Sequence, residues 1–265
     1  MRLMVWLTLV AWPIQAQAGV VGTDDRQTMA DYAIHQKQAI AAVRQQFQAS
    51  GRIMCPFGEA SAFLADRNDI VVTARHVLFP EKQMHAYAGK GSINRCGFEL
   101  TDGTQSTWYK VDVKSFVYPD DKQRSIFDRF DWVVMKLEVP IQGVTPYHVA
   151  NQPPSVGDSV ELVTIRQNDF PQDGWNERLV ADCKIRAVEA IDDKSASGLQ
   201  TDCSASGGAS GGALVKRGSD GWDVVGIMSS STPSCPRFDA HSCFTFDVGV
   251  YDDVKEAVHS LSGSK

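Results

Sequence analysis

Gly208-Ala209-Ser210-Gly211-Gly212 is the stretch that most constrains the fold and chemistry of this 265-residue chain. It presents one hydroxyl among residues small enough to leave the backbone open to a substrate. A serine hydroxyl attacks a carbonyl carbon only when a nearby imidazole accepts its proton and backbone N–H groups bind the oxyanion. Because residues 204–212 are all Ser, Ala or Gly, a flexible linker is the alternative. We disfavour it because the segment lies between Asp202-Cys203 and the apolar run Ala213-Leu214-Val215.

Two upstream motifs supply a base and an acid. Thr73-Ala74-Arg75-His76 ends an apolar run, and Asp131 directly precedes the strand-like run at 132–138. His76 is the best placed of the six histidines, and an imidazole of near-neutral pKa suits a general base. Asp128 competes with Asp131 for the role of the acid. We favour Asp131 because it opens the expected strand, whereas Asp128 has an arginine beside it.

The order His76, Asp131, Ser210 and the surrounding motifs resemble the chymotrypsin-like serine proteases. The matching motifs are T-A-x-H, an Asp that opens an apolar strand, and G-x-S-G-G. The resemblance covers about residues 52–262. It implies a catalytic triad of these three residues and an oxyanion hole formed by the N–H groups of Gly208 and Ser210.

The chain beyond Arg52 consists of short apolar or alternating runs separated by Gly, Asn, Asp and Pro, a texture typical of barrels or sandwiches. The expected strands are residues 60–64, 69–73, 108–117, 132–138, 159–165, 183–189, 213–215, 223–228 and 244–250. The expected fold is all-β, with two six-stranded antiparallel β-barrels, an N-terminal helical arm and a C-terminal helix.

The expected segments are a signal peptide (1–18), an N-terminal arm (19–51), a first barrel (52–140), a linker (141–154), a second barrel (155–251), and a C-terminal helix and tail (252–265). Apolar residues at near-helical spacing predict one helix over 28–48 within the arm. The arm is either a regulatory or pro-region or a segment packed against the barrels, and we favour the packed segment.

The first 18 residues have the features of a secretory signal peptide. A short basic start and a brief apolar segment precede Ala16-Gln17-Ala18, a small-residue cleavage site. We expect cleavage after Ala18 and a secreted or periplasmic protein. No other segment approaches the roughly 18 apolar residues of a spanning helix, so we expect no membrane insertion. The net charge of −6 argues against nucleic acid as a partner.

Six cysteines in an exported chain favour disulfides over metal ligation, and the absence of a C-x-x-C pair argues against a zinc site. Six cysteines allow about 15 pairings. The resemblance to bacterial secreted proteases implies the pair Cys183–Cys203. We then expect Cys235–Cys243 to close a small loop near the cleft, which leaves Cys55–Cys96 as the third pair.

The chain departs from the digestive members of the family at two positions. Ala209 replaces the aspartate that precedes their nucleophile, so their salt-bridge activation cannot operate here. Val77 replaces the cysteine that follows the histidine in animal members. Both differences point to the bacterial, glutamyl-endopeptidase-like branch.

The resemblance also implies a substrate pocket. Its base would be Ser204, and its walls would be Ser229, Ser230, Ser231 and Gly249. No acid stands at that base in the sequence, and Met228 replaces the histidine of Glu-selective relatives. We therefore expect a neutral pocket for apolar or small side chains.

These observations predict a secreted serine endopeptidase that works through an acyl-enzyme and needs neither a cofactor nor a metal. We expect a monomer whose partners are protein or peptide substrates and a protein inhibitor. The main alternative is an inactive homologue that binds peptides or a partner in the cleft. A lipase or esterase is a third possibility because residues 208–212 also satisfy G-x-S-x-G, but only 55 residues follow Ser210, too few for that fold.

Overall fold

The computed structural model describes most of the chain beyond the expected signal peptide. The described residues are 19–56, 58–79, 95–101, 105–119, 129–165, 167–170, 177–189, 198–251 and 253–263. The expected signal peptide (1–18) and the competing acid Asp128 lie outside them. Among the described residues, no helix combines the length and hydrophobicity needed to cross a bilayer.

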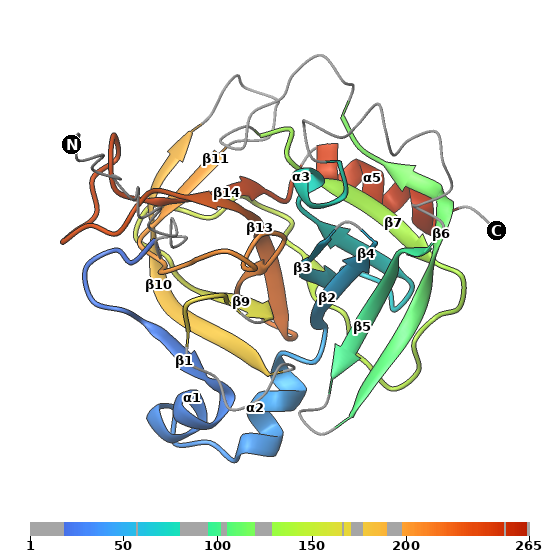
Figure 1. Ribbon diagram of the computed structural model, residues 1–265, viewed down its shortest axis with the longest axis horizontal. Helices are drawn as coiled ribbons and strands as arrows, with labels where there is room; N and C mark the ends of the chain where they lie inside the picture. Colours follow the sequence, from blue (N-terminus) through green and yellow to red (C-terminus); the bar gives the residue numbers. More distant parts are fainter. Residues whose placement is uncertain are drawn as a thin grey trace, which may run out of the picture.

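The first barrel closes from six antiparallel strands in the order β2-β3-β4-β7-β6-β5 (Figure 1). The strands are β2 (Ser50–Cys55), β3 (Gly58–Leu64), β4 (Ile70–Thr73), β5 (Gly97–Thr101), β6 (Ser106–Val117) and β7 (Val133–Leu137). All four residues of β4 are buried, and this β-branched run suits a strand that is covered on both faces. Its neighbour β7 carries the chain away from Asp131.

The second barrel also closes from six antiparallel strands, in the order β9-β10-β11-β14-β13-β12, with β12 paired back to β9. The strands are β9 (Ser159–Ile165), β10 (Arg178–Glu189), β11 (Gly198–Thr201), β12 (Ala213–Arg217), β13 (Trp222–Ser231) and β14 (Thr245–Gly249). The short strand β8 (His148–Val149), inside the expected linker, pairs in parallel with β13. The expected class, two six-stranded antiparallel barrels, is confirmed.

The N-terminal arm packs against the second barrel below β10 (Figure 1). Its strand β1 (Arg26–Thr28) pairs antiparallel with β10, and two short helices follow, α1 (Met29–His35) and α2 (Ile40–Gln46). The expectation of one helix over 28–48 is therefore wrong. The helical pattern is interrupted at Lys37, whose φ of 54° is left-handed and cannot continue an α-helix.

Aromatic packing attaches the arm to the barrel. Phe47, just after α2, is fully buried. Its ring lies 5.5 Å from that of Tyr32 and 5.0 Å from that of Trp222 in β13. The helices thus bury one face, as amphipathic segments do, and leave the other to solvent.

The C-terminal helix α5 (Asp253–Ser262) matches the expected helix closely. It buries Val254, Ala257, Val258 and Leu261. This face packs on β7 and β4 of the first barrel (Figure 1).

Candidate active site

His76 and Asp131 are brought together by the pairing of two strands. His76 lies in α3 (Arg75–Leu78), a single turn directly after β4, and Asp131 lies two residues before β7. β4 and β7 pair with Thr73 opposite Val133, so the two side chains share one end of the sheet.

Asp131 binds His76 through both of its carboxylate oxygens. The His76 Nδ1 atom lies 2.7 Å from Oδ2, and the His76 backbone N–H donates to Oδ1 at 2.8 Å. That N–H belongs to the first turn of a helix and has no partner within the helix. The carboxylate, only 5% exposed, therefore holds both the ring and the backbone of His76.

The second barrel supplies the hydroxyl. Ser210 Oγ lies 3.0 Å from His76 Nε2, within reach for proton transfer. The structure thus places in one chain of contacts the three residues that the sequence separates by 55 and 134 positions. This arrangement has the geometry of a nucleophile, a base and an orienting acid.

Ser229 was expected in the wall of the substrate pocket, but its side chain contacts the catalytic-acid candidate Asp131 instead. Its hydroxyl donates to Asp131 Oδ2, and its carbonyl oxygen lies 3.4 Å from Ser210 Oγ. The residue is only 2% exposed. Its side chain therefore serves the acid rather than a pocket surface, and no feature of the sequence distinguishes it from Ser230 and Ser231.

The loop on both sides of the nucleophile has a backbone shape that requires glycine. Gly208 and Gly211 have φ of +101° and +80°, the left-handed region that other residues avoid. The Gly208 carbonyl accepts hydrogen bonds from Ser61, at 3.3 Å from its N–H and 2.9 Å from its hydroxyl. In the described part of the chain, no protein acceptor receives the N–H of Gly208 or of Ser210.

The expected pocket residues are only partly brought together. Ser230 and Ser231 pair with Phe246 and Thr245 of β14, because β13 has an irregularity between residues 228 and 230. Gly249 lies opposite Gly226 instead, so it is not the strand partner of these serines.

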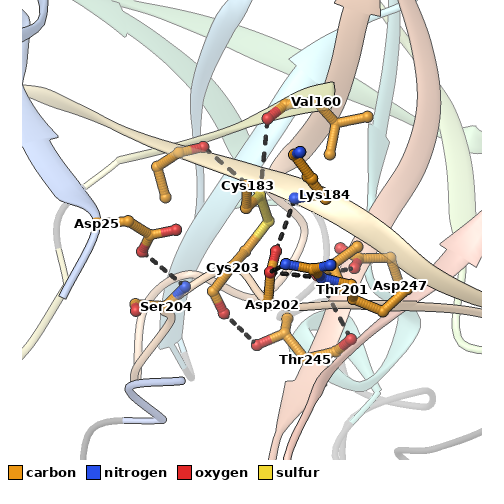
Figure 2. Close-up of a disulfide and its surroundings, with 12 residues drawn as sticks. Asp25, Val160, Cys183, Lys184, Thr201, Asp202, Cys203, Ser204, Thr245 and Asp247 are labelled. Atoms are coloured by element: carbon orange, nitrogen blue, oxygen red, sulfur yellow. Dashed lines mark hydrogen bonds and ion pairs between the residues drawn. A yellow bond between two sulfur atoms is a disulfide. The ribbon is translucent and has the colours of Figure 1, made fainter. Parts of the chain in front are cut away.

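Ser204, the expected base of the pocket, is fully buried. Its backbone N–H donates to Asp25 Oδ1 at 2.9 Å (Figure 2). The sequence placed no acid at this point, and the structure brings one from the N-terminal arm. Burial raises the pKa of Asp25 to about 6.

The three expected disulfides are the three that the structure contains among its described residues: Cys55–Cys96, Cys183–Cys203 and Cys235–Cys243. Cys183 belongs to β10, and Cys203 directly precedes Ser204 (Figure 2). This disulfide therefore attaches the start of the nucleophile loop to the barrel.

A second buried acid, Asp247 in β14, was not anticipated from the sequence. It is fully buried, and its Oδ2 accepts a hydrogen bond from Thr201 Oγ1 at 3.1 Å. Burial raises its pKa to about 7, although the Thr201 hydrogen bond favours the charged form.

We expect Asp247→Asn to raise the free energy of unfolding at pH 8, on the order of 2 to 4 kcal/mol. The folded-state pKa lies above the ordinary value of 3.8. Protonated Asp247 therefore makes its full contribution to the free energy of unfolding below about pH 4, and this contribution is lost as the pH rises through 7. Urea unfolding at pH 4, 6 and 8 should show the variant and the parent converging at the lowest pH.

Asp158→Asn is the matched control. The Ser155 N–H and Lys216 lower the pKa of Asp158, so the same substitution should reduce stability at pH 8. An Asp247→Asn protein no more stable than the parent at pH 8 would contradict the raised pKa of Asp247.

Comparisons with protein families and with solved structures both find similar proteins. The model of the trypsin-like peptidase domain family matches residues 60–227. A solved structure of a Glu endopeptidase in complex with MPD has a TM-score of 0.65 and 11% sequence identity, covering 92% of this chain and 100% of that chain. No curated protein matches the chain significantly. At this identity the structural match shows the fold.

Proposed function

Because this chain belongs to the family of trypsin-like peptidase domains, we propose that it is a secreted serine endopeptidase that uses His76, Asp131 and Ser210. The observation that carries the proposal is the pair of contacts at His76. One ring nitrogen lies 2.7 Å from the carboxylate of Asp131, and the other lies 3.0 Å from the hydroxyl of Ser210.

The proposed reaction has two stages. Ser210 Oγ attacks the scissile carbonyl carbon while its proton moves to His76 Nε2, and Asp131 stabilises the resulting imidazolium. The carbonyl oxygen becomes an oxyanion bound by the N–H groups of Gly208 and Ser210, and one such donor contributes about 3 to 4 kcal/mol. His76 then protonates the leaving amine, which leaves an acyl-enzyme. Water, deprotonated by His76, hydrolyses the acyl-enzyme and restores Ser210.

Export and specificity are parts of the proposal. Three disulfides favour an oxidising compartment, in agreement with the signal peptide expected at 1–18. We retain the pocket for apolar or small side chains beside Ser230 and Ser231 as a proposal, since Asp25 reaches the expected base only at the backbone N–H of the fully buried Ser204.

A peptidyl phosphonate tests the function directly. We expect it to label one serine per chain, at Ser210, because the activated hydroxyl attacks phosphorus as it attacks a carbonyl. Peptide mapping by mass spectrometry should show the label lost in Ser210→Ala and in His76→Ala. Ser219→Ala, an exposed serine paired with Asp220, is the control and should label like the parent.

A parent protein that takes no label, or a His76→Ala variant labelled at the parental rate, would favour the inactive homologue. Paired assays on casein and a long-chain ester distinguish a peptidase from an esterase.

A further inference from the structure

Three consecutive residues of the nucleophile loop, Ser204, Ala205 and Ser206, are each held by the N-terminal segment at 19–26. The loop itself contains no charged residue from 204 to 209, so every charged group that contacts it comes from elsewhere in the chain.

The first two contacts use backbone atoms of the loop. Gly19 and Ala205 exchange backbone hydrogen bonds of 2.8 Å and 3.0 Å, like one rung of an antiparallel sheet. Asp25 accepts the N–H of Ser204 (Figure 2). The space around Gly19 is tight, since an added Cβ would lie 2.4 Å from Ser231 Oγ.

The third contact is the side chain of Arg26, which is only 3% exposed. Its guanidinium donates to Asp24, to Asp169 Oδ1 at 2.8 Å and to Gln167 Oε1 at 3.0 Å. It also reaches Ser206 Oγ at 3.4 Å. A planar group with several donors is suited to joining this many acceptors at once.

Gln167 and Asp169 in turn hold Ser206. The Ser206 N–H donates to Gln167 Oε1 at 2.8 Å, and its hydroxyl donates to Asp169. The Asn168 N–H donates to the carbonyl of Gly207 at 2.9 Å. Burial disfavours the charged form of Asp169, but the hydrogen bonds from Arg26 and Ser206 outweigh it and lower its pKa.

We propose that residues 19–26 form a clamp on the nucleophile loop and that Arg26 is a positioning residue for the oxyanion-binding N–H of Gly208. The inference rests on the proposed function. Arg26 holds the segment 167–170, that segment holds Ser206 and Gly207, and Gly208 follows directly. Oxyanion donors act only within a narrow range of positions, so loosening residues 204–207 should weaken transition-state binding more than substrate binding.

Arg26→Met in the exported chain, with the rest of the segment 19–26 intact, tests the clamp. We expect kcat/KM on a peptide substrate to fall about 10- to 100-fold, through kcat, with KM changed less than about threefold. A peptide aldehyde forms a hemiacetal whose oxyanion occupies the same site, so its inhibition constant should rise by the same factor. A purely structural role would not produce this parallel change.

Arg44→Met is the matched control. Arg44 lies in the same arm, is paired with Glu177 at 3.7 Å and is 35% exposed. It should leave kcat/KM and aldehyde inhibition within about twofold of the parent.

Ser206→Ala answers the same question if Arg26→Met does not fold. It removes the hydroxyl that contacts Asp169 and Arg26 while the Ser206 N–H keeps its bond to Gln167. We expect about a 3- to 10-fold loss in kcat/KM with the same aldehyde signature.

Equal kcat/KM for the Arg26 and Arg44 variants overturns the clamp, as does a loss in kcat/KM without a matching rise in the aldehyde constant. Those results require an active parent. A parent that neither cleaves peptides nor takes the phosphonate label would instead refute the proposed function.

Discussion

Asp131→Asn is expected to lower kcat by about four orders of magnitude without unfolding the protein. Asp131 accepts the His76 backbone N–H at one oxygen and the ring Nδ1–H at the other. Asparagine can supply one acceptor, for the backbone N–H, but it presents an NH₂ group to the ring. The ring would then carry its proton on Nε2, the nitrogen that must accept the proton of Ser210.

The measurement is kcat on a peptide substrate together with thermal unfolding of each variant. Asp128→Asn is the natural control, because Asp128 is the acid that competes with Asp131 in the sequence, and it should leave kcat near the parental value. An Asp131→Asn enzyme that keeps more than about a tenth of the parental kcat would show that another group orients His76.

Gly211→Ala is expected to have the second largest effect, at least about a 100-fold loss in kcat/KM. An added Cβ would lie 2.1 Å from Thr73 Oγ1 and 2.2 Å from the Ser61 carbonyl oxygen. Both atoms belong to the first barrel, and Thr73 leads directly to His76. The methyl group must therefore separate the nucleophile loop from the strand that carries the base. The φ of +80° adds backbone strain, so stability should fall by about 2 to 4 kcal/mol.

Gly58→Ala is the control for Gly211→Ala, since an added Cβ at residue 58 meets no atom within 4 Å. Steady-state kinetics and urea unfolding of both variants separate the two effects. A Gly211→Ala enzyme with the parental kcat/KM would show that the contact of residue 211 with Thr73 and Ser61 does not position the nucleophile.

The candidate triad and the fold class could be read from the sequence because each depends on local pattern. Small residues around Ser210, an apolar strand ending near His76 and an acid opening the next strand are all contiguous motifs. Many short strands favoured barrels or a sandwich, and the resemblance to chymotrypsin-like proteases implied six strands in each barrel, although β2, β5 and β11 were not anticipated. β11 has only four residues, and β2 begins Ser50-Gly51-Arg52, with little apolar alternation to mark it.

The remaining features depend on contacts between remote positions, which no local pattern encodes. The Asp25 to Ser204 bond spans 179 positions, and the Arg26 to Ser206 contact spans 180. The bond from Ser229 to Asp131 joins the two barrels, and three adjacent serines offered no reason to choose one of them. The break between α1 and α2 occurs at one left-handed residue, Lys37. Lysine has a high helix propensity, so the sequence did not predict a helix end there.

Each terminal segment of the described chain packs on the barrel that is farther from it in the sequence. The arm that precedes the first barrel covers the second, and α5, which follows the second barrel, covers β4 and β7 of the first. Each barrel is therefore covered by a segment that is adjacent in sequence to the other barrel. Cutting the connection at 141–154 would not yield two self-sufficient pieces, since the first would lose the cover of Val254 and Val258, and the second would lose that of Tyr32 and Phe47.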